Sequence, residues 1–417
     1  MNWQTFMADT TVQLPEKLSN LRVAIVQHWF VSRGGAERVV ESFARIFPQA
    51  DLVSPIVRKE LLPLSVQDRK VQTSFLSKLP RVEKYHRHTL PLQPFALEQL
   101  DLCEYDLVLT SDAGPAKGVL TLPRTTHVCY CHSPMRYIWD MYHQYASEMS
   151  PVVRAVFSMT AHYLRNFDYR AAARVDHFIS NSRFVSQRVQ KYYRRESTVI
   201  NPPVDVQSAE ISPDYDDYYL SVGRLVSYKR VDLAVQACTK LKRPLRVIGD
   251  GPEYKSLKRI AGPMVEFLGN VSDSEVRANF ARCRALLFPC EEDFGIVPVE
   301  ANAFGRPVIA YGSGGALESV RGLQRRGNAR DDATGLFFHE QTAEALADTM
   351  VQYERRANEF NPFNIRAHAM KFDTSIFEQR MVDYLYAVLP GERNAREQHE
   401  FEVENEKAFA AVSGDLR

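Results

Sequence analysis

The sequence lacks the features of a membrane-spanning, secreted or disulfide-built protein. None of its 417 residues belongs to an uninterrupted apolar run of about 18 or more, so no spanning helix is expected. The first twenty residues include Asp9 and Glu16 and have no apolar central region, which argues against a secretory signal. The six cysteines show no framework spacing, and we therefore expect a reducing, cytoplasmic environment.

The sequence also lacks an excess of either charge. Its formal net charge of +1 argues against a polyanion as the main partner, so no nucleic acid is expected. The dinucleotide fingerprint G-x-G-x-x-G is absent, which argues against a nicotinamide cofactor. A hydrophobic share of 45% and a charged share of 25% are ordinary for a globular protein, and the length suits two domains.

Short apolar runs alternate with amphipathic stretches from Leu21 onward, a pattern typical of βαβ units and parallel sheets. The paired prolines Pro202 and Pro203 and the polar residues after them indicate a domain boundary near 203. We expect an α/β fold of two Rossmann-like domains, 1–202 and 203–373, with a cleft between them, an apolar-faced helix at 374–389 and a polar tail at 391–417. The predicted strands are 22–27, 106–110, 126–131, 176–180, 218–222, 244–248, 264–268, 284–288 and 307–310.

The most informative segment is the run of nine residues from Glu292 to Glu300, which places two glutamates around a Phe-Gly turn. A strand precedes it, and 298–303 is predicted as the first part of a helix. Glu292 then lies at the carboxyl end of a strand, where open α/β sheets bind ligands. Backbone N–H groups of Phe294, Gly295, Ile296 and Val297 and the helix N-terminus would favour an anion, and Glu300 would bind ribose hydroxyls. Two solvated charges are the alternative.

Glycines and cations follow other predicted strands. Gly34 and Gly35 open a helix after the first strand, where they allow a phosphate or sugar to approach the backbone; a plain tight turn is the alternative. Arg224 and Lys229 follow the first strand of the second half, where a diphosphate would need cations; a surface charge cluster is the alternative. Two further predicted strands are followed by loops that contain Gly249 and Val271. These loops either contact the donor or are ordinary turns.

His132 ends a predicted strand at the edge that faces the cleft, so it is a candidate for contact with substrate. The alternative is a structural histidine with its hydrogen bonds satisfied inside the protein. The preceding His127, Cys129 and Cys131 share one strand face, where buried thiols fit better than zinc ligands. The segment 74–97 mixes apolar and basic residues. It is either a contact for an anionic membrane or a lipid diphosphate, or a solvated surface.

Together these motifs resemble the retaining, nucleotide-sugar-dependent glycosyltransferases of family four, over roughly residues 20 to 390. That family has the GT-B architecture of two Rossmann-like domains. The elements that carry the resemblance are Gly34 to Arg38, His132 within Cys-His-Ser-Pro, Gly223-Arg224 with Lys229, Gly249 to Pro252, and Glu292 to Glu300. The run from Tyr130 to Asp140 is more narrowly similar to bacterial mannosyltransferases of surface-polysaccharide assembly.

The resemblance implies roles for these residues. Arg224 and Lys229 would bind the donor diphosphate in place of a metal, so neither metal nor cofactor is expected. Glu292 and the backbone of Phe294 to Val297 would hold the sugar and phosphate, Glu300 the ribose, and His132 the transferred sugar. Gly35 would close on the donor, and the helix 374–389 would cross back to the first, acceptor-side domain. One departure is Gln27-His28-Trp29, where many relatives carry His-Asp-Trp, and acceptor choice is expected to differ there.

The implied activity is transfer of a hexose, with α-mannose from GDP-mannose favoured, to a glycan or polyprenyl-diphosphate-linked acceptor. The location would be the cytoplasm, with peripheral contact at the inner face of the plasma membrane through 74–97. The alternatives are a UDP-sugar-dependent transferase, a GT-B epimerase, or a sugar-nucleotide-binding subunit without activity.

Overall fold

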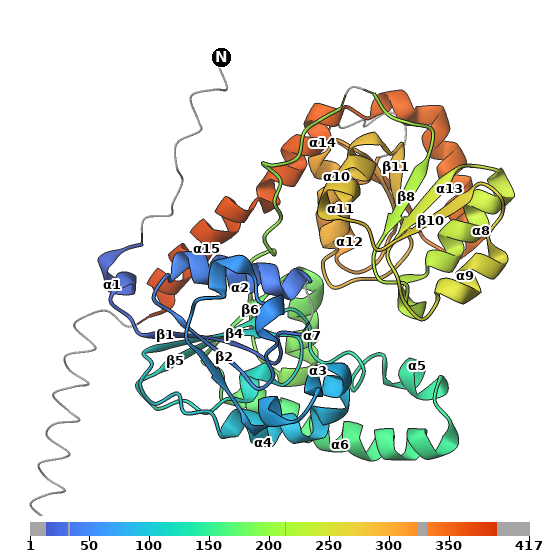
Figure 1. Ribbon diagram of the computed structural model, residues 1–417. Coiled ribbons are helices and arrows are strands. Elements are labelled where there is room, and N and C mark those ends of the chain that lie inside the picture. Colours follow the sequence, from blue (N-terminus) through green and yellow to red (C-terminus); the bar gives the residue numbers. More distant parts are fainter. Residues whose placement is uncertain (1–13, 32–33, 213, 324–331, 390–417) are drawn as a thin grey trace, which may run out of the picture.

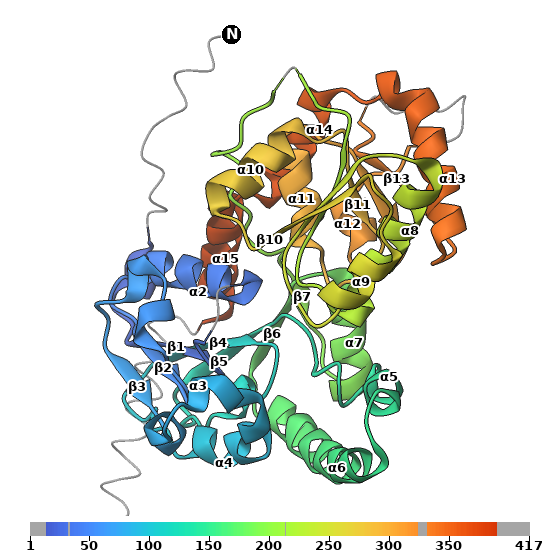
Figure 2. The ribbon, with the colours of Figure 1, turned by 45° about the vertical axis from the view of Figure 1, so that its right-hand side comes forward.

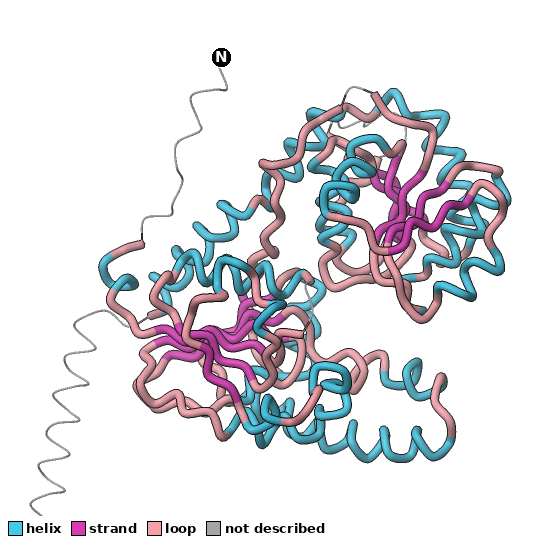
Figure 3. The backbone as a smooth tube through the Cα atoms, in the orientation of Figure 1, coloured by secondary structure: helices cyan, strands magenta, loops and turns pink. Residues whose placement is uncertain are grey.

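The computed structural model describes residues 14–31, 34–212, 214–323 and 332–389. It contains two α/β units, each with a parallel sheet between helices (Figures 1 and 3). The expected α/β fold is confirmed. The polar tail predicted at 391–417 lies outside the described residues.

The first sheet has the strand order β3-β2-β1-β4-β5-β6-β7, and every pairing is parallel. Its central strands are buried along their whole length because helices cover both faces, which explains their near-continuous apolar sequence. The strands are Val23–Gln27 (β1), Asp51–Ser54 (β2), Val71–Thr73 (β3), Leu107–Asp112 (β4), Thr126–Cys131 (β5), His177–Ser180 (β6) and Thr198–Val199 (β7).

Helices of the first unit pack on this sheet, and α2 is the one that enters the cleft. Gly34 is its N-cap, and Val39, Val40 and Phe43 face the core at helical spacing. The α-helices are Glu16–Ser19 (α1), Gly35–Ile46 (α2), Val82–Tyr85 (α3), Gln93–Glu98 (α4), Tyr142–Ser147 (α5), Pro151–Ala173 (α6) and Arg183–Tyr193 (α7). The 3₁₀ turns are Lys59–Leu61 (η2), Leu64–Val66 (η3), Phe75–Lys78 (η4), His86–Leu92 (η5) and Ala116–Gly118 (η6).

The second sheet has the order β10-β9-β8-β11-β12-β13, again parallel. Its strands are Tyr219–Val222 (β8), Leu245–Ile248 (β9), Val265–Gly269 (β10), Ala285–Phe288 (β11), Val308–Tyr311 (β12) and Gly335–Phe338 (β13). Its α-helices are Val231–Leu241 (α8), Tyr254–Ile260 (α9), Asp273–Arg282 (α10), Ile296–Ala303 (α11), Ala316–Ser319 (α12), Ala343–Arg356 (α13) and Pro362–Ala369 (α14). The 3₁₀ turns are Ser227–Lys229 (η7), Ala357–Glu359 (η8) and Met370–Phe372 (η9).

The chain passes between the two units twice, and the two passages lie side by side. Val204 and Asp373 form an isolated parallel bridge where they meet. After the second passage, Thr374–Val388 (α15) returns to the first unit, beside α2 (Figures 1 and 2). Phe377 of α15 stacks on Phe43 with 6.2 Å between ring centroids, so this helix completes the first core.

No helix within the described ranges combines the length and the apolar character needed to cross a membrane. The segment 74–97, for which the sequence suggested a membrane contact, is a series of short turns and helices: η4, α3, η5 and α4. Leu76 and Val82 anchor it to a small core, while Phe75, Leu92 and Phe95 are exposed.

Candidate functional site

A cleft of about 880 Å³ separates the carboxyl ends of the two sheets. It brings together most of the residues that the sequence singled out, from both units. The predicted residues that line it are Gly34, Gly35, His132, Lys229, Glu292, Phe294, Gly295, Ile296, Val297 and Glu300. This convergence needs the fold, because the residues come from loops and helices far apart in the chain.

The other three predicted donor residues lie in an adjoining hollow of about 520 Å³, lined by Arg224, Gly249 and Val271. Gly223 connects the two hollows. It lines the second one, and a Cβ atom built on it would be 3.5 Å from Nζ of Lys229, which lines the cleft. The geometry therefore divides the predicted donor residues into two neighbouring groups at one sheet edge. Arg224 is exposed there.

Lys229 and Glu292 form the central ion pair of the cleft, with 2.6 Å between Nζ and Oε1. Both side chains are largely buried, at 15% and 22% exposure. Burial alone would lower the pKa of Lys229, but the neighbouring Glu292 carboxylate raises it, and the net change is upward. Lys229 is therefore a fixed positive charge at the end of η7, in the connection that follows β8. The resemblance predicts that Glu292 contacts sugar hydroxyls; in this structure its carboxylate pairs with Lys229.

The N-terminus of α11 lines the same cleft, and its first-turn backbone N–H groups have no acceptor within the helix. Gly295 is the N-cap and has a φ of 84°, a left-handed conformation that glycine adopts readily. The helix begins at Ile296, two residues earlier than predicted. Pro298 fits its first turn, because proline has no backbone N–H and first-turn N–H groups have no acceptor within the helix. Across the cleft, a Cβ atom on Gly35 would lie 2.8 Å from Ile296 Cδ1, so the two units touch there.

His132 faces this helix from the end of β5. Its Nε2 is 2.8 Å from Ser111 Oγ, and its carbonyl oxygen accepts a hydrogen bond from Asn181 Nδ2 at 2.9 Å. Burial lowers the pKa of His132 to about 4. The imidazole is therefore neutral near pH 7, a state that can both donate and accept hydrogen bonds with sugar hydroxyls.

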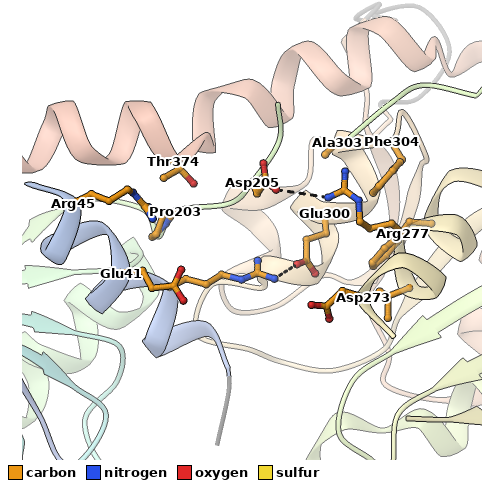
Figure 4. A pocket seen from close by; sticks show the side chains of 13 residues that line it. Glu41, Arg45, Pro203, Asp205, Asp273, Arg277, Glu300, Ala303, Phe304 and Thr374 are labelled. Atoms are coloured by element: carbon orange, nitrogen blue, oxygen red, sulfur yellow. Dashed lines mark ion pairs between the residues drawn. The ribbon is translucent and has the colours of Figure 1, made fainter. Parts of the chain in front are cut away.

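Glu300 has a partner that the sequence did not indicate. Arg38 Nη2 of α2 lies 2.8 Å from its Oε1, so the carboxylate predicted to bind ribose is paired across the cleft. The pair also borders a third hollow, of about 510 Å³, between α2, α10, α11 and α15. Figure 4 shows this hollow, with the Asp205–Arg277 ion pair (3.7 Å) on its other side.

Asp293 is a second residue whose role the sequence did not reveal, although it lies inside the Glu292–Glu300 motif. Its carboxylate accepts hydrogen bonds from Ser133 Oγ at 3.2 Å and from Arg188, and Arg136 is 3.7 Å away. All three partners belong to the first unit. Burial raises the pKa of Asp293, while Arg136 and Arg188 oppose that change. Asp293 thus joins the loop that starts the Glu292–Glu300 motif to the opposite unit.

The residues at the end of β1 organise the Gly-Gly helix. Gln27 Nε2 donates to Glu37 Oε1 at 3.1 Å and to the Trp29 carbonyl at 3.0 Å. Glu37 is almost fully buried, which raises the pKa of its carboxyl group. The neighbouring His28 is also buried, and its ring lies 4.2 Å from that of Trp29. The departure at 27–29 is therefore part of the packing beneath the cleft.

The strand face of His127, Cys129 and Cys131 lies in the core. His127 Nε2 is 3.2 Å from Thr110 Oγ1, and burial raises the pKa of both thiols. Within the part of the chain that the structure describes, no three His, Cys, Asp or Glu side chains are grouped in a way that would hold a metal ion.

Sequence comparisons match two family models that together run through both units. Residues 33–208 match "Glycosyltransferase Family 4", and residues 206–366 match "Glycosyl transferases group 1". The α-1,3/1,6-mannosyltransferase ALG2 of Saccharomyces cerevisiae is 25% identical over 288 residues, 55% of each chain. A GDP-mannose-dependent α-(1-6)-phosphatidylinositol monomannoside mannosyltransferase of Mycobacterium tuberculosis is 31% identical over 149 residues, 31% of this chain and 36% of that protein. The chain spans about half the length, or less, of these curated relatives.

Solved structures support the fold. HepE from Anabaena, in complex with UDP, aligns with a TM-score of 0.65 and 19% identity, over 88% of this chain and 100% of that one. Sucrose-phosphate synthase from Thermosynechococcus elongatus also aligns with a TM-score of 0.65, at 17% identity, over 88% and 98% of the two chains. The motifs, the family models and the two-sheet architecture agree, and the chain belongs to the glycosyltransferases of family four, with the GT-B fold.

Proposed function

We propose that the protein transfers α-mannose from GDP-mannose to a lipid-linked or oligosaccharide acceptor in cell-surface polysaccharide synthesis, with retention of configuration. The observation that carries the proposal is the Lys229–Glu292 pair beside the N-terminus of α11, opposite His132 in one cleft. A cation and free backbone N–H groups suit a diphosphate, and neutral polar groups opposite them suit a sugar. The names of the mannosyltransferase relatives favour mannose and, in one case, GDP-mannose.

In the proposed reaction the bond between the anomeric carbon and the donor phosphate oxygen breaks. The acceptor hydroxyl oxygen bonds to the same face of that carbon, and its proton passes to the departing phosphate oxygen. Lys229 and Arg224 stabilise the negative charge that develops on the diphosphate, which is the role a metal ion plays in other transferases. The proposal therefore needs neither a metal nor a cofactor. It places the protein in the cytoplasm, at the inner face of the membrane.

The test is a donor panel of GDP-mannose, UDP-glucose and UDP-N-acetylglucosamine, read by nucleotide release with a polyprenyl-diphosphate-linked glycan as acceptor. GDP release from GDP-mannose is expected. Release of UDP instead would replace this proposal by a UDP-sugar-dependent transferase, and conversion of the sugar without transfer would indicate an epimerase. Nucleotide binding without turnover of any donor would indicate a binding subunit.

Two substitutions test the cations. Lys229→Ala and Arg224→Ala should each lower kcat about 100-fold or more, since each removes charge stabilisation from the transition state. Lys240→Ala is the matched control, because Lys240 is an exposed cation of the same unit, paired loosely with Glu344 at 3.9 Å. Full turnover by the Lys229 and Arg224 variants would contradict the assignment.

A further inference from the structure

An apolar stripe runs along the solvent face of α6. Val152, Val156, Met159 and Tyr163 are 76%, 61%, 76% and 47% exposed. Their spacing of four, three and four residues puts them on one stripe of the helix. The opposite face is the one that packs, through buried residues such as Ala161 and Leu164. The helix therefore has apolar side chains on both faces, and the outer stripe has no partner among the described residues.

Within α6 itself, no acidic side chain is exposed. The only acid in α6 is Asp168, which is fully buried and is bound by Lys117, Trp139 and Tyr193. Arg170 is exposed and follows Tyr163 by seven residues, two helical turns along the same stripe. An apolar stripe that continues into a cation, with no exposed acid on its helix, suits a negatively charged partner with an apolar interior.

A second apolar and basic surface lies at the same end of the molecule. Figures 1 and 2 both show α4 and α6 at the lower edge of the first unit. Phe95 of α4 and Leu92 before it are 57% and 51% exposed. The exposed cations of the same segment form no ion pair with any described residue; they are Lys78, Arg81, Lys84 and Arg87.

This end of the molecule also reaches the cleft. Glu148, between α5 and α6, accepts a hydrogen bond of 3.1 Å from Ser227 Oγ. Ser227 begins η7, the turn that ends at Lys229. A partner bound to the outer face of α6 would therefore lie near η7, where the donor diphosphate is expected.

We propose that the outer stripe of α6, with Leu92 and Phe95, is a docking face for an anionic lipid bilayer. The apolar side chains would enter the headgroup region while the cations bind anionic headgroups. A second copy of this chain fits less well, because a two-fold interface would set these unpaired cations against their own copies. The face is separate from the donor-binding residues, so it stands or falls independently of the mannosyl-transfer proposal.

The experiment is co-sedimentation of the full chain with vesicles of phosphatidylcholine alone or with phosphatidylglycerol. The chain should bind the anionic vesicles, and high salt should weaken the binding. The triple variant Val152→Ser, Val156→Ser, Met159→Ser should bind at least about tenfold more weakly, because it removes the side chains that enter the bilayer. Arg170→Gln should weaken binding about fivefold, and only to anionic vesicles.

The matched control is Phe363→Ser with Leu317→Ser, two residues of the second unit that are 71% and 55% exposed. It should bind vesicles as the unaltered chain does. All of these positions are at the surface, so an unchanged thermal unfolding curve and an unchanged far-UV circular dichroism spectrum would show that each variant is folded. Equal vesicle binding by the triple variant would overturn the proposal. So would a stable dimer of the unaltered chain that the triple variant dissociates, since the face would then belong to a second copy.

Discussion

Arg38 of α2 and Glu300 of α11 form an ion pair of 2.8 Å that joins the two units across the cleft. If Glu300 binds the donor ribose, the ribose hydroxyls and Arg38 compete for one carboxylate. The pair is partly exposed, at 44% and 22%, and such pairs contribute about 0.2 to 1 kcal/mol. Arg38→Gln should therefore tighten GDP binding up to about fivefold, whereas Glu300→Gln should weaken it. Isothermal titration would measure both. Weaker binding by both variants would mean that Arg38 itself holds the nucleotide.

The loop that carries Glu292 rests on the backbone of Gly315. Gly315 N–H donates to the Glu292 carbonyl at 2.8 Å, and a Cβ atom on Gly315 would lie 2.2 Å from Phe294 Cα. Gly315→Ala must displace this backbone, at a cost of about 1 to 3 kcal/mol in stability, and should also lower kcat. Gly262→Ala is the control, because its Cβ atom would press only on the Thr239 side chain, 2.7 Å away and outside the cleft-lining residues. It should lower the melting temperature and leave kcat unchanged.

Lys117 contacts two fully buried carboxylates. It lies 3.0 Å from Asp112 and also pairs with Asp168, and all three side chains are 0% exposed. Lys117→Met should lower the free energy of unfolding by about 3 to 5 kcal/mol, since it leaves the two buried carboxylates without their cation. Urea unfolding measures this loss. Adding Asp112→Asn to the variant should restore part of the stability; no recovery would mean that Asp168 alone accounts for it.

Buried histidines should make stability depend on pH. Burial, with nearby Arg174 and Lys117, lowers the pKa of His127 to about 3, against about 6.5 in the unfolded chain. Between these values the unfolded state binds the proton and the folded state does not. Stability is therefore full above pH 6.5 and falls as the pH drops toward 3, by about 1.4 kcal/mol per pH unit for this residue. His127→Asn should reduce that slope between pH 6 and 4, measured by denaturant unfolding. An unchanged slope would assign it to other groups.

Much of the fold could be predicted from the sequence. The nine predicted strands agree with the observed ones within about two residues, because buried parallel strands are continuous apolar runs. The edge strands β3, β7 and β13 and the neighbouring β2 were not predicted. They have two to four residues each, so a periodic pattern has little length in which to show.

The sequence predicts which site residues lie together within each unit, but not which residues of the two units meet. Strand ends place Lys229 and Glu292 at one sheet edge, because parallel strands all end on the same side. The contacts of Arg38 with Glu300 and of Arg188 with Asp293 depend on how the two units face each other. Local sequence patterns carry no information on that placement, and the outer stripe of α6 looks from sequence like an ordinary core-facing pattern.

The two side-by-side passages at Val204 and Asp373 have a mechanical consequence. Two connections at one place act as a single hinge line, and rotation about it needs little stretching of either passage. Points near the line hardly move, while points far from it sweep through the largest arc. Figure 1 places α15 at one side of the molecule and α5 at the other. The Ser227–Glu148 hydrogen bond is therefore at the end of a long lever arm, and it would be among the first contacts to break as the cleft opens.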